Sequence, residues 1–264
     1  MPSVSNIAVG ALVAGAAATK ARHGMNESIA RLSTGLRSIY GGDAAGQSVA
    51  NTLQARSKSW AMAARNAEDG ISAAQTAESA LLEIAALAQR LRELGIQADN
   101  AALLDDDNDE AALDAEAVAV ADAIDAIVSK ATFNGVALLG TSAVSTNIGV
   151  TDDGGTVALK TTNGISAVTA ISQAGASDGT ADETLKEVAI SLGHVAAGIA
   201  ALKARQAVAY SASANLAAAA SRIEDTDFAK ETANLAKNSV LNQSAMAMVA
   251  QANQAQSAIL AVLQ

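Results

Sequence analysis

Residues 185–223 read LKEVAISLGHVAAGIAALKARQAVAYSASANLAAAASRI, and their apolar spacing is the clearest secondary-structure signal in the chain. From Leu185 through Val195 to Ile223, mostly apolar residues recur at spacings that alternate between three and four. This spacing is a heptad seam sustained over about five heptads, which predicts one long helix packed against partner helices with a left-handed crossing. A strand has a period of two and cannot produce this pattern.

Two further segments carry apolar stripes with helical spacing. The stripes comprise Ala74, Ala77, Leu81, Ile84, Ala88 and Leu91 in one segment, and Leu113, Ala117, Val120, Ile124 and Ile127 in the other. Between them, residues 98–110 read ADNAALLDDDNDE, where Asp and Asn interrupt the pattern and place acidic residues at the start of the next helix. We therefore expect an antiparallel helical hairpin, and three helices that share one core.

The middle of the chain has a different composition. From Asn134 onward, Thr, Ser, Val, Gly and Asn replace the helix formers, and an Asn-Gly pair occurs at Asn134 and at Asn163. Residues 144–150, 156–161 and 165–172 are β-rich runs bounded by turn residues, so a small hairpin or three-stranded sheet is predicted at about 134–180.

Both ends of the chain are apolar and free of charge. Residues 238–264 contain no charged side chain, no Gly and no Pro, and the first positive side chain of the N-terminal run is Lys20. A helix that is apolar on all sides is either buried or spans a membrane. The eight Asn and Gln residues of 238–264 are costly in hydrocarbon unless they find partners, so membrane insertion is disfavoured.

These ends suit an interior lined by identical chains. The residues expected to form this assembly core are Val4, Ile7, Ala11, Ala14 and Ala18 in the N-terminal helix, and Leu241, Ala245, Met248, Ala252, Ala255, Ile259 and Val262 in the C-terminal helix. A single chain offers too little folded protein to cover both helices, so we expect them to be disordered until assembly.

Composition argues against several functional classes. The net charge of −10 disfavours nucleic acid and anionic membranes as partners, because both reward clustered Lys and Arg. Without Cys, and with only His23 and His194 as near-neutral acids or bases, no catalytic motif is apparent, so an enzyme is not expected and neither is a cofactor. Residues 105–116 resemble a calcium loop in spacing, but Glu110 stands where the loop needs Gly, so no metal site is expected either.

Five segments resemble bacterial flagellin, in flagellin order. They are RLSTGLRSIYGGDAAGQSVAN (31–51), RNAEDGISAAQTAESAL (65–81), QRLRELGIQADN (89–100), TFNG (132–135) and SRIEDTDFAKETANLAK (221–237). The resemblance implies a structural subunit of the bacterial flagellar filament, a self-polymerising helical tube used as a propeller. It also implies export to the cell exterior through the flagellar export apparatus, with an export chaperone and a cap protein as partners.

The resemblance and the periodicity together give a mostly α fold: a coiled-coil bundle of long helices with a small β-hairpin insertion, in which the N- and C-terminal helices pair. We expect residues 1–42 and 220–264 to form an inner domain and residues 43–219 an outer one. The segment 140–182 is too short for the extra outer domains of longer flagellins. Alternatives are a hook–filament junction protein and a membrane-active helical secretion protein.

The family resemblance also suggests one binding site and shows two departures. Gln89, Arg90, Leu94 and Gln97 match positions that host innate-immune receptors for flagellin recognise, although a solvated face packed against neighbouring subunits is the main role expected for them. Typical members read SAKDDAAG where this chain has YGGDAAG, which retains Asp43 but introduces Gly41 and Gly42. Gly95 stands where a small residue is usual, and Gly weakens a helix by roughly 1 kcal/mol relative to Ala.

Overall fold

The structure is a computed structural model that describes residues 2–39, 41–100, 108–161, 164, 165, 168 and 174–263. The side chains of residues 2–8, 161, 176, 259, 260, 262 and 263 lie outside that description. The helices are α1 (Pro2–Thr34), α2 (Ala44–Ala98), α3 (Asp109–Lys130), α4 (Ser177–Glu224) and α5 (Phe228–Leu263). A short 3-10 helix covers Ala174–Ala176, and the strands are β1 (Thr132–Phe133), β2 (Val136–Ala137), β3 (Val144–Gly149) and β4 (Thr156–Thr161).

The chain divides into two compact units. The first comprises Met1–Ala55 and Leu216–Gln264, and the second is Arg56–Asn215. The sequence placed this division at 42–43, just before the start of α2, and at 219–220, near the end of α4. The observed division lies inside α2 and α4, because the first turns of α2 remain bonded to the end of α4. Gln54, for example, donates its side-chain amide to the Glu224 carboxylate at 2.5 Å.

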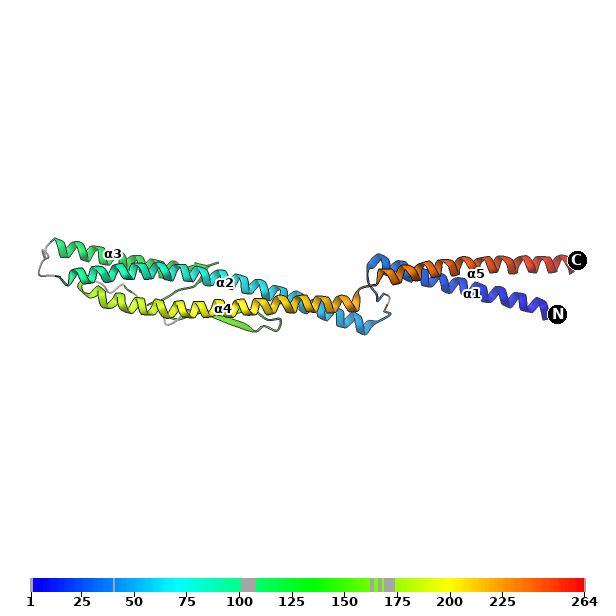
Figure 1. The fold of residues 1–264 in the computed structure, drawn as a ribbon, viewed down its shortest axis with the longest axis horizontal. Coiled ribbons are helices and arrows are strands. Elements are labelled where there is room, and N and C mark those ends of the chain that lie inside the picture. Colours follow the sequence, from blue (N-terminus) through cyan, green and yellow to red (C-terminus); the bar gives the residue numbers. More distant parts are fainter. Residues whose placement is uncertain are drawn as a thin grey trace. The chain divides into compact units, whose positions relative to one another are not determined.

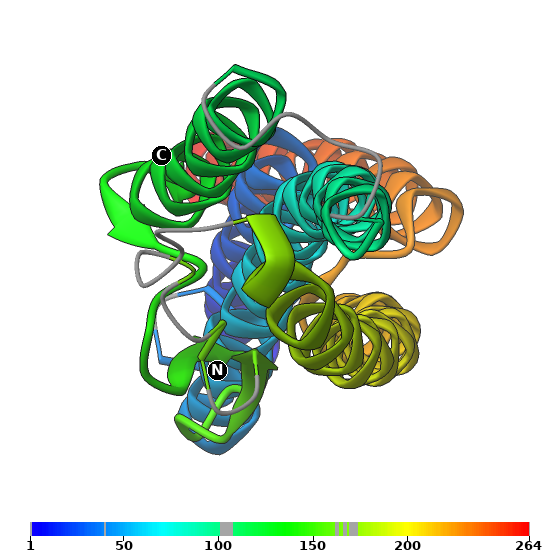
Figure 2. The same cartoon turned by 90° about the vertical axis from the view of Figure 1, so that its left-hand side faces the viewer.

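The second unit is a bundle of α2, α3 and part of α4, whose ends are seen in Figure 2. The predicted stripe on α2 is buried without exception, from Ala74 to Leu91. It packs with Leu113, Ala117 and Ile124 of α3 and with Val188 and Val195 of α4 in one hydrophobic core. The heptad interpretation of this bundle is therefore confirmed.

Polar contacts along the bundle fix which parts of its helices lie side by side. Ser57 Oγ on α2 donates to the backbone oxygen of Ser213 on α4 at 2.9 Å. At the other end of the unit, Ser177 Oγ donates to the backbone oxygen of Leu91 at 2.9 Å. Since the sequence numbers rise on α2 as they fall on α4, the two helices are antiparallel. Arg90 on α2 pairs with Glu116 on α3, which places α3 beside the end of α2, as predicted for the hairpin.

The β insertion contains two small antiparallel sheets. Strands β1 and β2 are joined through Asn134 and Gly135, whose φ angles of 50° and 79° are those of a tight hairpin turn. Strands β3 and β4 pair from Val144↔Thr161 to Gly149↔Thr156. The third predicted run, 165–172, lies mostly outside the described residues. Helix α4 begins at Ser177, close to the predicted end of the insertion.

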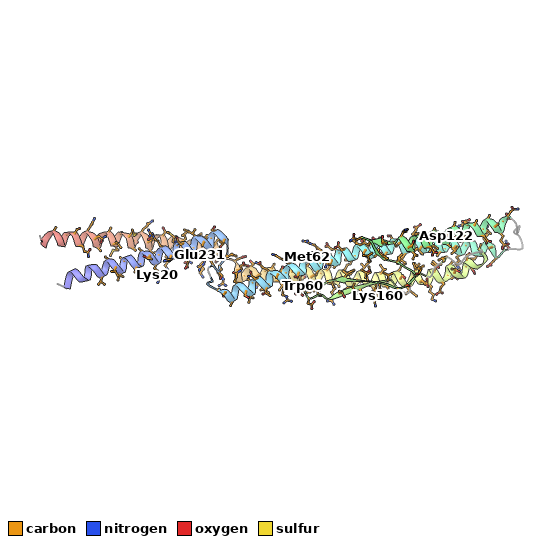
Figure 3. The ribbon with its side chains drawn as sticks, turned by 180° about the vertical axis from the view of Figure 1, so that it is seen from behind. Lys20, Trp60, Met62, Asp122, Lys160 and Glu231 are labelled. Carbon is orange, nitrogen blue, oxygen red and sulfur yellow. The ribbon has the colours of Figure 1, made fainter. Side chains whose placement is uncertain are left out.

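The first unit is dominated by an antiparallel pair of helices, α1 and α5 (Figure 1). Arg31 near the end of α1 approaches Glu231 near the start of α5, with 3.6 Å between Nη1 and Oε1. Further along the pair, the side-chain amide of Asn238 on α5 lies against the backbone of Gly24 on α1. A Cβ added at Gly24 would come within 2.6 Å of the Asn238 amide nitrogen. Figure 3 labels Lys20 and Glu231 on this pair. The predicted pairing of the terminal helices is confirmed.

By length and composition alone, α4 is the one helix among the described residues that is apolar enough to cross a membrane. Buried core helices satisfy the same criterion. Val188, Val195 and Leu202 of α4 are fully or almost fully buried in the bundle.

Candidate assembly surface

A groove runs between α1 and α5 in the first unit. It has a volume of about 850 Å³. It is lined by Val9, Gly10, Val13, Ala14, Ala17, Lys20 and Ala21 of α1, and by Lys237, Asn238, Leu241, Ser244, Ala245 and Met248 of α5. Lys20 and Lys237 are the only charged residues among these. The charge-free part of α1 precedes Lys20, and the charge-free part of α5 follows Lys237.

Several of the larger apolar side chains of the helix pair are exposed to solvent. The apolar residues buried between the two helices are small: Ala18, Ala21 and Ala245. By contrast, Leu12 is 78% exposed and Met248 is 59% exposed. Within the described residues, every hydrophobic core cluster lies in Arg56–Asn215. The α1–α5 pair is therefore an apolar surface with little core of its own, which is the property of an interface that another molecule covers.

The predicted assembly residues divide between the inside and the outside of this pair. Ala11, Ala14, Ala252 and Ala255 are half-buried, and Ala18 and Ala245 are buried. Leu241 and Met248 are exposed and line the groove. Val4, Ile7, Ile259 and Val262 lie on helix backbone whose side chains are outside the described set. Whether these positions contact other subunits stays a prediction.

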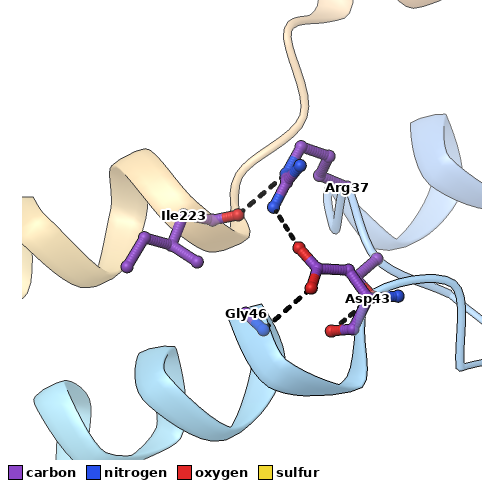
Figure 4. Close-up of polar contacts among 5 residues, drawn as sticks. Arg37, Asp43, Gly46 and Ile223 are labelled. Carbon is purple, nitrogen blue, oxygen red and sulfur yellow. Dashed lines mark hydrogen bonds and ion pairs between the residues drawn. The ribbon is translucent and has the colours of Figure 1, made fainter.

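Hydrogen bonds of Arg37, Asp43 and Glu224, called here the polar clasp, hold together the segments that follow α1 and α4 (Figure 4). Arg37 donates through Nε to the backbone oxygen of Ile223 at 2.9 Å and through Nη2 to Asp43 Oδ2 at 2.8 Å. The second carboxylate oxygen of Asp43 accepts the backbone N–H of Gly46 at 2.8 Å, so Asp43 caps the start of α2. The Gly46 N–H, followed by the Arg37 guanidinium, lowers the pKa of Asp43 below its usual 3.8.

Backbone pairing and a buried carboxylate complete the clasp. Arg37 N donates to the backbone oxygen of Glu224 at 2.7 Å, and Thr226 N donates to the oxygen of Gly35 at 2.8 Å. The side chain of Glu224 is buried and accepts the amides of Gln47 at 3.1 Å and Gln54 at 2.5 Å. The two connecting segments are therefore fastened to each other and to the first turns of α2.

Two family models match the chain. The bacterial flagellin N-terminal helical region matches residues 6–143, and the bacterial flagellin C-terminal helical region matches residues 179–263. A flagellin of Bacillus subtilis is 35% identical over an alignment that covers 88% of this chain and 90% of that protein. The chain belongs to the bacterial flagellin family.

A second flagellin sequence agrees with this assignment. A flagellin of Halalkalibacterium halodurans is 34% identical, covering 88% of this chain and 89% of the other. A crystal structure of Bacillus cereus flagellin aligns with 58% of this chain and 88% of that chain, at 24% identity and a TM-score of 0.37. As a flagellin, the chain is a structural subunit of the bacterial flagellar filament. The hook–filament junction and membrane-active alternatives are not supported, because both matched models describe flagellin.

The candidate receptor positions of this flagellin do not share one face. Gln89, Arg90 and Gln97 are exposed on α2, and Arg90 bonds to Glu116 at 2.6 Å. Leu94 has no exposed surface and belongs to the core of the bundle. A side chain in that position cannot contact a second protein while the bundle is intact, so a direct role for Leu94 is inconsistent with its burial.

Gly95 has a packing role that sequence reasoning missed. It lies where α2 meets the start of α4, and a Cβ there would come within 2.6 Å of the backbone nitrogen of Asp178 and 2.7 Å of Ser177 Oγ. This close approach lets Ser177 donate to the backbone oxygen of Leu91. The helix-weakening effect of Gly is thus offset by tertiary packing.

The other candidates considered in the sequence gain no support as sites. His23 and His194 are exposed. Of the calcium-loop spacing, Asp105 and Asp107 lie outside the described residues, and Glu116 is bonded to Arg90. Gly41 adopts a φ of 77° in the turn before Asp43, a conformation that few other residues adopt without strain. The YGGDAAG departure therefore supplies the flexible backbone that this version of the turn uses.

Proposed function

We propose that this flagellin polymerises by placing apolar side chains of a second copy in the groove between α1 and α5. The observation that supports this is the mismatch between burial and side-chain size. Ala fills the inside of the pair, while Leu241 and Met248 remain exposed along the groove. Fully burying a Leu or Met side chain contributes about 1.5–3 kcal/mol, so repeated burial along the groove favours the polymer.

A second copy suits this groove better than lipid. Asn238 lines the groove, and Ser244 lies beside it on the same helix. Such polar groups are costly in hydrocarbon. The α5 helix of another copy carries the same Asn and Gln residues and can satisfy them, which an acyl chain cannot.

The experiment compares Leu241→Gln with Leu82→Gln. Leu241 lines the groove and is 49% exposed, whereas Leu82 lies on α2 in the second unit and is 56% exposed. The chemical change and the exposure are therefore matched. Purified monomers are seeded with filament fragments, and the concentration left unpolymerised is measured after sedimentation.

Leu241→Gln is expected to raise that critical concentration at least roughly 30-fold, since losing Leu burial and desolvating an amide costs about 2 kcal/mol or more per added subunit. Leu82→Gln is expected to change it less than threefold. Equal values for the two variants would show that the groove is not the assembly surface.

We further propose that the chain reaches the cell exterior through the flagellar export apparatus, with an export chaperone and a cap protein as partners. Family membership supports this proposal. Loss of the chain from the medium when flagellar export is disabled is the expected result, and its continued release would contradict it.

For the host receptor, Gln89, Arg90 and Gln97 form the accessible part of the proposed site. Weaker receptor binding by Gln89→Ala, with binding unchanged by Leu82→Gln, is expected.

A further inference from the structure

All sulfur in this chain belongs to methionine. The chain contains five Met and no Cys. Among the described side chains, Met246 and Met248 on α5 and Met62 on α2 are each at least half exposed, and Met25 on α1 is half-buried. Because no thiolate competes for an oxidant, the exposed thioethers are the groups on this chain that a peroxide oxidises.

One of the exposed thioethers lies in the groove between α1 and α5. Met248 lines this groove, whereas Met246 and Met62 do not. Met248 follows Leu241 by seven residues, or about two helical turns, so the two side chains share one face of α5. Met246 is two residues away from Met248, and the corresponding rotation of about 200° directs it away from that face.

The part of the groove around Met248 has an aliphatic wall. Asn238 lies against Gly24, and the antiparallel register continued from there for ten residues places Met248 near Ala14. The α1 residues that line this part of the groove are Val9, Gly10, Val13, Ala14 and Ala17. None of their side chains can donate a hydrogen bond. On α5, Lys237 is eleven residues from Met248, which is about 16 Å along the helix.

Oxidation places a polar atom at this position. A lone pair of the Met248 sulfur attacks one oxygen of hydrogen peroxide, the O–O bond breaks, an S–O bond forms, and the second oxygen leaves as water. The sulfur loses two electrons and the peroxide gains them. The product is methionine sulfoxide, which is polar and disrupts interfaces that the thioether can join. Burying its oxygen against aliphatic groups without a donor is costly.

We propose that Met248 is a redox-sensitive site, and that its oxidation by a peroxide prevents a second copy from occupying the groove. This inference rests on the proposed polymerisation through that groove. In the free chain Met248 is 59% exposed, so water solvates the sulfoxide and the fold is retained. In the polymer the sulfoxide has to be desolvated. A thioether that a second copy already covers is protected, so the modification acts on the free chain before it is added.

The test compares Met248→Leu with Met62→Leu. Met62, labelled in Figure 3, lies on α2 in the second unit and is 50% exposed, close to the value for Met248. Leu has nearly the volume of Met and contains no sulfur, so each variant keeps an apolar side chain and loses one oxidation site.

Free chains are treated with hydrogen peroxide until peptide mass spectrometry shows one added oxygen on Met248 and Met62 where these are present. The peroxide is then removed, and the concentration left unpolymerised is measured after seeding and sedimentation. Urea unfolding followed by Trp60 fluorescence verifies that each variant is folded. If Met248→Leu assembles poorly without peroxide, Met248→Ile replaces it.

Peroxide is expected to raise this critical concentration at least roughly tenfold for the unmodified chain and for Met62→Leu, and less than roughly threefold for Met248→Leu. Methionine sulfoxide reductases supplied with a dithiol return the sulfoxide to the thioether while the dithiol becomes a disulfide. They should restore the critical concentration of the unmodified chain. In assembled filaments, the same peroxide treatment should produce at least roughly fivefold less sulfoxide at Met248 than in free chains.

Equal rises for Met248→Leu and Met62→Leu would overturn the inference, because the damage would then lie elsewhere. No rise for the unmodified chain would overturn it as well, and so would equal oxidation of Met248 in filaments and in free chains. The groove itself is tested without any oxidant by comparing Leu241→Gln with Leu82→Gln. A groove confirmed by that comparison together with peroxide-resistant polymerisation therefore refutes the redox site alone.

Discussion

Replacing Gly95 with Ala should destabilise this protein, although a Gly-to-Ala change at a solvent-exposed position of a helix normally stabilises that helix. Intrinsic helix propensity favours Ala by about 1 kcal/mol. In the folded chain, however, the new methyl group would lie 2.6 Å from the backbone nitrogen of Asp178 and 2.7 Å from Ser177 Oγ. A backbone atom cannot rotate away as the end of a side chain can, so the start of α4 must move.

The size of this effect follows from two costs. Overpacking typically costs 1–3 kcal/mol. Moving Ser177 also weakens its 2.9 Å hydrogen bond to Leu91, worth about 1 kcal/mol. After subtracting the propensity gain, Gly95→Ala should lower the free energy of unfolding by about 1–3 kcal/mol.

Gly193→Ala is the matched control. Gly193 is exposed within α4, and an added Cβ there has no neighbour within 4 Å. It should stabilise the chain by about 1 kcal/mol. Urea unfolding of the monomer, followed by the fluorescence of Trp60, measures both variants. If Gly95→Ala is as stable as the unmodified protein or more so, the close approach of α2 and α4 is refuted.

Two further predictions concern a carboxylate and a turn. Because the pKa of Asp43 is lowered in the folded state, its contribution to stability is present above about pH 4 and is lost as the pH falls through the lowered value. Asp43→Asn should therefore flatten the acid dependence of filament melting below about pH 4, and parallel curves would contradict this. Gly135 has a φ of 79°, so Gly135→Ala should lower the free energy of unfolding by about 1–2 kcal/mol, as measured by urea unfolding. Asn134→Gly in the same turn should lower it by less than half as much. Equal losses of stability in the two variants would argue against the assigned turn.

Helix periodicity could be predicted from the sequence because large and small apolar residues alternate with charged ones in the second unit. Leu91 stands between Arg90 and Arg92, and Ile124 has Asp122 and Asp125 close to it in sequence; both apolar side chains are fully buried. In α5 this contrast is missing. The least exposed of its positions include Asn242, Ala245 and Val249, while Leu241 is exposed. Where almost every residue is small or an amide, spacing alone does not show which face meets the partner helix.

Contacts between residues that are far apart in the chain could not be predicted from the sequence. The weak helix propensity of Gly95 was predictable, but its approach to Asp178 depends on where α4 begins, 82 residues further along the chain. The expected boundary at 42–43 likewise left all of α2 in the outer domain, whereas the bonds from Gln47 and Gln54 to Glu224 hold the first turns of α2 in the first unit. Such bonds join residues that are far apart in sequence and leave no local pattern.

We propose that the two charge-free ends are stable only among copies of themselves. The decisive experiment deletes residues 1–19 and 238–264 together and measures seeded polymerisation by electron microscopy and sedimentation. The shortened chain should keep the urea unfolding transition reported by Trp60 and form no filaments at concentrations where the full chain polymerises completely. Filaments from the shortened chain at the same concentration and rate as from the full chain would contradict the account.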